Sequence, residues 1–450
     1  MKQEDIRTYS PLIALILTLF LICVIWFFNI EPAKGQTDFF GVIRDSGGEV
    51  AQLNIAVANF AIDPSFFTSE DSANAVRLSR MVEDGLAFSL YFNVIHADSV
   101  VIALIGKENF SYDDWIFLGA EHLVGGKFSS DGVRYHLNLE ISDILRGKVI
   151  YKQEFNSALD SLTQLAYKTV DKIINILTGE IGISHSKIVF SLERKDTKEL
   201  AMCNWDGLQT STISNTGTIN LFPASDISGD NIFFTSYLKG NPDLYKLNLN
   251  SLSMVPISAR RGINSSPAIS PDGKHIALTL TVDNNAELYL LDMKGNIIRR
   301  LTKSWGIEGS PSFSPSGKEI VFSSDRSGNV HLYITDLEGI NKRKLTYRGS
   351  YNDTPSWSPK GDIIAFASRE KGEFQIYTMT VTGEKLKKLT FTGNNQDPCF
   401  SPDGLHICFV SNRNGNQEVY TMNFDGSNQR RVTTVKHAFN PYWMPGKEGR

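Results

Sequence analysis

The sequence predicts a two-domain protein, in which a small N-terminal α/β domain is followed by an all-β six-bladed β-propeller that a C-terminal strand closes. Two spacings predict the propeller. A proline recurs at intervals of 43 or 44 residues, as Pro223, Pro267, Pro311, Pro355, Pro398 and Pro441. A tyrosine keeps the same steps, as Tyr245, Tyr289, Tyr333, Tyr377 and Tyr420. Two markers that share one period of this length indicate a repeated structural unit.

One whole repeat spans residues 309–346 and contains four short strands. Ser314–Gly317 is a tight turn between the first strand and the apolar run 320–322. Polar residues separate this run from a third strand at 332–334, and a second turn leads to a fourth at 344–346. A lone four-stranded meander cannot bury both of its faces, so several copies are expected to pack radially as propeller blades.

The two ends of the repeat region predict how the ring closes. The first copy begins at 188–190, which matches the second strand of later copies, so this copy lacks a first strand. Residues 440–443 match the first strand at 354–357. One split blade and five whole blades make six, and the C-terminal strand is expected to complete the first blade, which leaves no open sheet edge.

Length and composition require a second domain. The chain has 450 residues, of which the propeller takes roughly 260. The predicted boundaries are 37–183 for the N-terminal domain and 184–450 for the propeller. A formal net charge of -4 and the absence of a dense run of lysine and arginine argue against a nucleic-acid partner.

Residues 1–36 are expected to direct export. Lys2 and Arg7 precede an apolar stretch from Pro11 to Ile30, and Ala33–Gly35 supplies the small residues typical of a cleavage site. The stretch is also long enough to span a bilayer without being cleaved, so a signal peptide and a signal anchor both stay open.

Residues 37–183 alternate strand and helix patterns. Apolar residues at helical spacing predict helices at 73–90, capped by Asp71 or Ser72, and at 159–177, which Thr178 and Gly179 end. Strands are expected at 53–58, 92–95, 123–126, 133–141 and 149–155. The glycine pair 125–126 lies inside a strand pattern with no helix after it, so no nucleotide cofactor is expected.

No catalytic, cofactor-binding or metal-binding residue is predicted. A prolyl-oligopeptidase-type hydrolase needs a Gly-x-Ser-x-Gly nucleophile motif, which the sequence lacks. The eight histidines are scattered along the chain. The repeated aspartates are interpreted as turn residues that accept backbone hydrogen bonds, at Asp272, Asp292, Asp336 and Asp403.

This organisation resembles the TolB family, whose members are periplasmic components of the bacterial Tol-Pal system. The resemblance rests on the export signal, the small α/β domain and a propeller repeat that reads Pro-x-Phe/Trp-Ser-Pro-Asp-Gly, and it covers essentially the whole chain. Residues 119–127 and 177–179 also resemble the family's first domain. The sequence departs from the repeat at 226–229, where Ser-Pro-Asp-Gly is expected, and at 444–446, where the last copy is one residue short.

The resemblance implies a non-enzymatic scaffold in the periplasm. TolB-like proteins bind the peptidoglycan-associated lipoprotein Pal through one end of the propeller and bind TolA through the mature N-terminal segment. They thereby support outer-membrane integrity and cell division. The chain is accordingly expected to be a monomer that is peripheral to the outer membrane through Pal and needs no cofactor. The alternative is an exported ligand-binding or structural propeller outside the Tol-Pal system.

Two sets of residues are candidate partner sites under this resemblance. The Pal-facing set lies in the loops expected just before each innermost strand and comprises Asn264, Ser265, Ser266, Glu308, Gly309, Ser310, Asn352, Asp353, Thr354, Asn395, Gln396 and Asp397. The TolA-facing set is apolar enough to add as a strand to a partner's sheet and comprises Phe39, Phe40, Gly41, Val42, Ile43 and Arg44. Ordinary solvated turns are the alternative for the first set, and a strand packed within its own domain is the alternative for the second.

Two cysteines are predicted to be cross-strand neighbours. Pairing the hairpin around Asp403 and Gly404 places Cys399 opposite Cys408, with about 4.5 to 5.5 Å between their Cα atoms, a distance that a disulfide can bridge. An exported protein also meets an oxidising compartment. A disulfide and two half-buried thiols both stay open.

Overall fold

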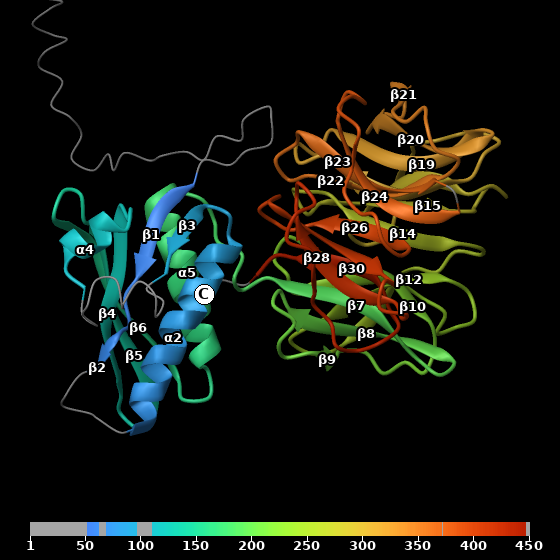
Figure 1. Cartoon of the computed structure of the whole chain (residues 1–450). Coiled ribbons are helices and arrows are strands. Elements are labelled where there is room, and N and C mark those ends of the chain that lie inside the picture. Colours follow the sequence, from blue (N-terminus) through green and yellow to red (C-terminus); the bar gives the residue numbers. More distant parts are fainter. Residues whose placement is uncertain (1–51, 63–68, 97–109, 371, 447–450) are drawn as a thin grey trace, which may run out of the picture.

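A computed structural model describes residues 52–62, 69–96, 110–370 and 372–446 of the chain. Within these residues, a domain of sheet and helices lies beside a six-bladed β-propeller (Figure 1). The predicted fold class is confirmed. The expected export segment 1–36 and the candidate TolA-facing segment 39–44 lie outside the described residues.

The N-terminal domain is built on one six-stranded sheet. Its strands are hydrogen-bonded in the order β3-β1-β4-β5-β6, and β2 also pairs with β4. Strands β3, β1 and β4 are parallel, whereas β4, β5 and β6 form an antiparallel meander. The bounds are β1 Leu53–Val57, β2 Ala61–Ile62, β3 Phe92–Ile95, β4 His122–Ser130, β5 Arg134–Asp143 and β6 Lys148–Ala158.

Two long helices cover the face of this sheet that lies toward the propeller (Figure 1). They are α2 Ser69–Phe88 and α5 Leu162–Thr178. Leu78 and Val82 of α2, Ile173 of α5 and Phe128 of β4 are fully buried in one core. The two helices are therefore held by apolar burial, at about 25 cal/mol for each Å² of apolar surface removed from water.

The opposite face of the sheet is covered by α4, Tyr112–Phe117. Ala56 packs with Trp115 in this second cluster, whereas its neighbours Ile55 and Val57 belong to the core under the long helices. This split follows from the alternation of side chains along a strand. Both faces of β1 are thus buried, as its run of apolar residues requires.

The predicted N-terminal strands and long helices are confirmed to within a few residues. The predicted helix cap is wrong, because α2 begins at Ser69 and Asp71 and Ser72 lie inside its first turn, where an acidic side chain offsets the positive end of the helix dipole. Gly179 does end α5, with a φ of 73° and its N–H donating to the carbonyl of Asn175. The sequence does not predict β2 or α4, which are too short to show a periodicity.

The propeller contains six four-stranded sheets, each an antiparallel meander. The blade that contains both ends of the propeller consists of β30 Ala438–Met444, β7 Lys187–Arg194, β8 Thr197–Asn204 and β9 Ser211–Thr212. The next two blades are β10 Asn220–Ser225, β11 Asn231–Ser236, β12 Asp243–Asn248 and β13 Met254–Ser258, then β14 Asn264–Ile269, β15 His275–Leu280, β16 Glu287–Asp292 and β17 Ile297–Arg300. The last three are β18 Glu308–Phe313, β19 Glu319–Ser327, β20 Asn329–Asp336 and β21 Lys342–Lys344, then β22 Asn352–Trp357, β23 Ile363–Glu370, β24 Glu373–Thr380 and β25 Lys387–Lys388, and finally β26 Asn395–Phe400, β27 His406–Ser411, β28 Glu418–Asn423 and β29 Arg430–Arg431.

The ring closes as predicted. Strand β30 pairs antiparallel with β7, so that Ala438 lies opposite Leu192 and Met444 lies opposite Lys187. The last strand of the chain is therefore the innermost strand of the first blade. This pairing occupies the free edges of both β7 and β30.

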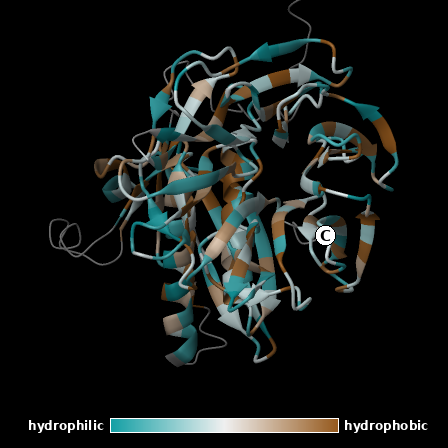
Figure 2. Ribbon diagram, turned by 90° about the vertical axis from the view of Figure 1, so that its right-hand side faces the viewer, coloured by the Kyte–Doolittle hydropathy of each residue, from teal (hydrophilic) through white to brown (hydrophobic). Residues whose placement is uncertain are grey.

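The repeated tyrosine has a packing role. Phe322 of β19 lies directly opposite Tyr333 of β20, with 5.9 Å between the ring centroids, and three other blades repeat this phenylalanine–tyrosine pair. Cross-strand aromatic pairs of this kind add about 0.5 to 1.5 kcal/mol beyond the area that they bury. Figure 2 shows hydrophobic stretches within many of the strands, whereas other strands are largely hydrophilic.

The Ser-Pro-Asp-Gly turns confirm the interpretation of the repeated aspartates. The Ser270 hydroxyl donates to Asp272 and accepts from the backbone N–H of His275, and Gly273 takes a φ of 68°, which glycine adopts without strain. The other aspartates act alike. Asp292 and Asp336 each accept from two backbone N–H groups in their own turns. Asp403 accepts from one backbone N–H and one hydroxyl.

A threonine or serine at the end of the repeat has the same role in five of the six blades. The Thr302 hydroxyl accepts from the backbone N–H of Leu288, on the third strand of the same blade. The same bond recurs at Ser214, Thr346, Thr390 and Thr433. The side chain takes over from the backbone there, so the fourth strand can leave the sheet without an unpaired donor.

Removing the closing strand should open the ring. Deletion of residues 438–450 would expose the inner edge of β7 and leave the first blade with three strands, so we expect loss of cooperative unfolding or aggregation in a thermal melt. Deletion of 447–450 alone is the control, because it leaves β30 whole. A 438–450 deletion that kept the melting temperature of the full chain would contradict the six-blade closure.

Candidate functional site

The two ends of the propeller differ in what they carry. The six innermost strands, β10, β14, β18, β22, β26 and β30, all run in the same direction. We call the end where they begin the mouth, and the end where the Ser-Pro-Asp-Gly turns follow them the base. The segments that link one blade to the next lie at the mouth, because they lead into the innermost strands.

The N-terminal domain attaches at the base. The His406 ring donates from Nε2 to the Phe88 carbonyl at 2.8 Å, and Lys360, in a base turn, lies 3.2 Å from the Glu180 carboxylate. The Phe88 ring stacks between Trp205 and His406, with centroid distances of 4.2 and 4.0 Å. These contacts between the described parts of the two domains leave the mouth uncovered.

Every innermost strand is bulged at the same place. The register with the neighbouring strand shifts just before or at the marker proline, which has no N–H to offer the ladder. The residue before each proline takes a positive φ, between 48° and 55°, although none of the six is glycine. We call these residues the inner ring: Phe222, Ser266, Ser310, Thr354, Asp397 and Asn440.

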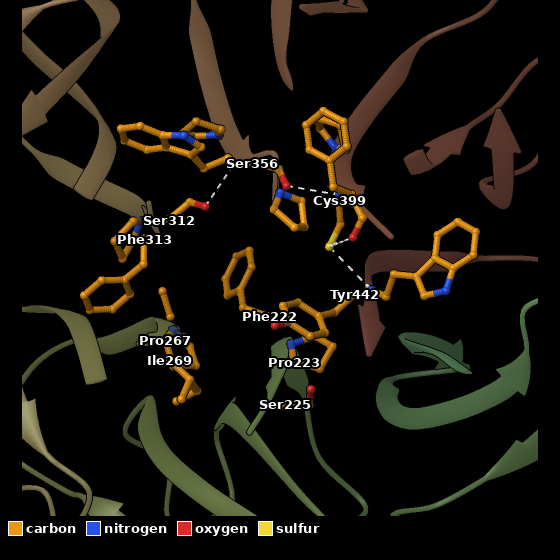
Figure 3. A pocket seen from close by; sticks show the side chains of 18 of the residues that line it. Phe222, Pro223, Ser225, Pro267, Ile269, Ser312, Phe313, Ser356, Cys399 and Tyr442 are labelled. Carbon is orange, nitrogen blue, oxygen red and sulfur yellow. Dashed lines mark hydrogen bonds between the residues drawn. The ribbon is translucent and has the colours of Figure 1, made fainter. Parts of the chain in front are cut away.

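The inner ring lines a central cavity of about 460 Å³. The six marker prolines also line it, and toward the base its wall is completed by the prolines that follow the innermost strands, Pro271, Pro315, Pro359, Pro402 and Pro445. Phe222 projects into the cavity, and Cys399 and Tyr442 lie on its wall (Figure 3). Non-glycine residues in the left-handed region cost of order 1 kcal/mol each or more, so the ring of them marks the axis as a candidate functional site.

Asp397 is the acidic member of the inner ring. Its carboxylate accepts from the backbone N–H and the side-chain amide of Asn440, at 3.3 and 2.9 Å. Burial raises the pKa of Asp397 to about 6, and the neighbouring Asp353 adds to the rise, against the two hydrogen bonds. The carboxyl therefore titrates close to neutral pH inside the cavity.

The twelve predicted Pal-facing residues are not in loops. All of them lie in strands, at the start of β14, β18, β22 and β26. The prediction of loops is wrong because a polar Asn/Glu-x-x-Pro pattern is typical of a turn, whereas here the bulge and buried hydrogen bonds accommodate the polar residues within the strand. The structure divides the twelve into three groups by position.

The first residue of each group is buried and shapes the linking segment at the mouth. The Asn264 amide donates to the Arg260 carbonyl at 2.7 Å and accepts from the Ser258 hydroxyl. Glu308 is also buried, and its burial raises its pKa even though Arg326, Ser304 and a second serine bind its carboxylate. Asn352 and Asn395 bond in the same manner as Asn264. These four buried side chains support the linking segments at the mouth.

The other eight residues lie nearer the axis. The third of each group, Ser266, Ser310, Thr354 and Asp397, belongs to the inner ring. The second of each group, Ser265, Gly309, Asp353 and Gln396, is half-buried between the mouth and the cavity. Of these eight residues, only the four of the inner ring line the central cavity.

The sequence prediction missed a patch of exposed apolar side chains at the mouth. Trp305, Ile307, Tyr347 and Phe391 are 73%, 62%, 75% and 72% exposed. They lie on three successive linking segments, and we call them the mouth patch. Lys344 lies over the Tyr347 ring and Lys388 over the Phe391 ring, which places positive charge around the patch.

The mouth patch could have been found from the sequence, because its aromatic residues follow the repeated Leu-Thr pairs. Tyr347 and Phe391 each follow a Leu-Thr pair directly, and Trp305 stands two residues further on in its own copy. A large aromatic residue in a linking segment, beyond the last strand of its blade, has no core position to fill. Comparing the linking segments across the copies would have found all three.

The described residues show neither a metal site nor a membrane helix. In the described part of the chain, histidine, cysteine, aspartate and glutamate form no group of three or more that could hold a metal ion. No helix within those residues is long and apolar enough to cross a membrane.

Comparison with known proteins agrees with both domains. Residues 174–447 match the family model of the TolB beta propeller domain, and residues 42–150 match that of the TolB amino-terminal domain. The chain belongs to the TolB family. The resemblance inferred from the repeat and the domain order is thereby confirmed.

Relatives within the TolB family are distant. Protein TolB homolog from Chlorobium luteolum is 31% identical over 223 residues, which cover 49% of each chain. Tol-Pal system protein TolB from Alkalilimnicola ehrlichii is 31% identical over 170 residues, 37% of this chain and 39% of that protein. The chain thus spans about half the length, or less, of the curated relatives that it matches.

A solved TolB structure shares the fold. The crystal structure of TolB from Acinetobacter baumannii superposes with a TM-score of 0.74 at 23% sequence identity, and the match covers 88% of this chain and 97% of that one. At this identity the comparison shows that the two proteins share a fold.

The raised pKa of Asp397 predicts a dependence of stability on pH. The folded pKa of about 6 lies above the ordinary value of 3.8, so the folded state binds the proton more tightly than the unfolded state does. The stabilisation is fully present below about pH 4 and is lost as the pH rises through 6, up to about 3 kcal/mol in all. Asp397→Asn keeps an acceptor for Asn440, so urea denaturation should find this variant more stable than the parent at pH 7.5.

The control variant changes a carboxyl whose pKa is shifted in the opposite direction. Hydrogen bonds within its turn hold the pKa of Asp292 below the ordinary value, so the contribution of Asp292 is lost as the pH falls. Asp292→Asn should therefore leave the decline between pH 4 and 7 in place. An Asp397→Asn variant that kept this decline would show that another group causes it.

Proposed function

We propose that this chain is a non-enzymatic scaffold of the Tol-Pal envelope system in the periplasm. In this proposal the propeller binds Pal at its mouth and the N-terminal segment binds TolA, in support of outer-membrane integrity and cell division. The observation that carries the proposal is the mouth patch. It lies on a TolB-family propeller whose other end, the base, contacts the N-terminal domain.

The chemistry of the mouth supports a protein partner. Trp305, Tyr347 and Phe391 are large aromatic side chains left in water, and such residues dominate the binding energy of protein interfaces. They stand on linking segments that buried hydrogen bonds of Asn352, Asn395 and Glu308 hold in shape, so little ordering is needed on binding. An exposed aromatic patch at the mouth fits a partner that covers this end of the propeller.

The N-terminal segment supports the second half of the proposal by its sequence. Phe39, Phe40, Val42 and Ile43 precede a Ser-Gly-Gly sequence and the first described strand, β1. A short apolar segment can add as a strand to a partner's sheet. In this proposal the segment binds TolA in that way and the described sheet is left intact.

A second candidate function has its own observation. The central cavity is of the size that binds small molecules, and the Asp397 carboxyl and the inner-ring hydroxyls would give it polar contacts. This favours a ligand-binding propeller outside the Tol-Pal system. Co-purification with Pal from an envelope extract distinguishes the two, since a small-molecule receptor would not retain Pal.

The mouth patch predicts where Pal binding is lost. The triple change Trp305→Ala, Tyr347→Ala and Phe391→Ala removes exposed aromatic surface only, so we expect Pal affinity to fall at least tenfold, about 1.4 kcal/mol, in isothermal titration calorimetry, with an unchanged melting temperature. The matched control is Ile340→Ala with Leu252→Ala, exposed apolar residues in turns between the third and fourth strands, at the base. Equal losses in both variants would argue against binding at the mouth.

Deleting the N-terminal segment should remove TolA binding without affecting the propeller. Deleting residues 37–44 is expected to abolish binding to TolA while the fold and Pal binding are kept, whereas charge changes at Asp353 and Asp397 are expected to weaken Pal binding alone. Pull-down with each partner separately, together with a circular dichroism melt, makes the measurement. If the deletion unfolded the N-terminal domain or left TolA binding intact, the segment would be a structural strand.

A further inference from the structure

Two cysteines meet at the wall of the central cavity. Cys399 of β26 lies directly opposite Cys408 of β27, as the hairpin register predicts. Both are free thiols. At directly opposed positions the Cα atoms are about 4.5 to 5.5 Å apart, within the range that a disulfide spans. A disulfide between Cys399 and Cys408 would therefore need little movement of the backbone.

The two thiols differ in access. Cys399 is half-buried and lines the cavity, with its sulfur turned toward the strand of Tyr442 (Figure 3). Cys408 is fully buried behind it, in the cluster that contains Phe88, Trp205 and Trp443. A reagent that enters the cavity meets Cys399 first and can reach Cys408 only through it.

The surroundings of Cys399 favour its thiolate. The Cys399 sulfur accepts from the backbone N–H of Trp443 at 3.4 Å. A hydrogen bond from the Cys408 thiol lowers the pKa of Cys399, and the Trp443 N–H and the Ser356 hydroxyl add to this effect against the cost of burial. Burial raises the pKa of Cys408 well above its usual value, so the second thiol keeps its proton until its partner has reacted.

We propose that Cys399 and Cys408 form a thiol–disulfide exchange site that takes small disulfides through the central cavity. Cys399 is the attacking sulfur and Cys408 the resolving one. The cavity of about 460 Å³ admits a molecule of peptide-fragment size and excludes a folded protein. This inference concerns chemistry at the cavity wall and does not depend on the proposed binding of Pal or TolA.

The exchange proceeds in two displacements. The Cys399 thiolate attacks one sulfur of a disulfide R–S–S–R, which forms a mixed disulfide on Cys399 and releases one R–S⁻ that takes up a proton. The Cys408 thiol then gives up its proton, its sulfur attacks the Cys399 sulfur, and the second R–S⁻ leaves as a thiol. The protein loses two hydrogens, and the small disulfide is reduced to two thiols.

The test uses the folded chain, reduced and then freed of reductant, with oxidised glutathione as the probe at pH 8. Peptide mapping by mass spectrometry should find a Cys399–Cys408 disulfide. In parallel, a small alkylating reagent should modify Cys399 at least about a hundredfold faster than Cys203, because burial raises the pKa of Cys203 to about 12. Cys203→Ser is the matched control and should behave as the parent does.

Trapping variants test the two roles. Cys408→Ser should hold glutathione on Cys399 as a stable mixed disulfide, and Cys399→Ser should leave Cys408 unmodified. The proposal is overturned if the parent reacts only after unfolding, if Cys203 reacts as fast as Cys399, or if the parent itself stops at the mixed disulfide. The parent's labelling order decides the matter even if a variant fails to fold.

Discussion

One antiparallel pairing, β30 with β7, is the constraint on which the propeller depends. Each blade can bury both faces only when it has neighbours on both sides, and the first and last blades have such neighbours only in a closed ring. The cavity, the inner ring and the mouth exist because the ring is closed. The first blade is completed by β30, which begins 244 positions (438 − 194) after the end of its partner β7, so this pairing closes the longest loop of the propeller.

The repeated residues each serve one step of the blade. The proline removes a ladder hydrogen bond where the innermost strand bulges. The tyrosine of the third strand packs on a phenylalanine of the second strand in four blades, and a threonine or serine replaces a backbone acceptor where the fourth strand ends. Because these roles are local and recur from copy to copy, the residues that fill them recur at a fixed spacing. The positions that differ between copies, such as Asp397, Phe222 and the mouth patch, are the ones free to provide function.

This division explains how much the sequence could predict. The fold, the six-blade count and the opposition of Cys399 and Cys408 follow from spacing alone, and the structure has all three. The twelve mouth residues were expected in loops because neither a bulge nor the buried bonds of Asn264 can be seen in a string of polar residues. The pKa of Asp397 depends on Asn440 and Asp353, which belong to neighbouring blades, and the stacking of Phe88 between Trp205 and His406 depends on the docking of two domains. No local pattern encodes either.

The attachment of the N-terminal domain also determines how the molecule would respond to tension. The chain passes from α5 into β7 at the base, and β7 is the second strand of its blade, held by β30 on one side and β8 on the other. A pull along the axis, from a partner at the mouth against one at the N-terminus, would enter along the length of β7. Two rows of backbone hydrogen bonds would then bear the load together. Had the chain entered through an edge strand, the same pull could peel the blade open one bond at a time, so the split first blade serves as a mechanical anchor as well as a seal.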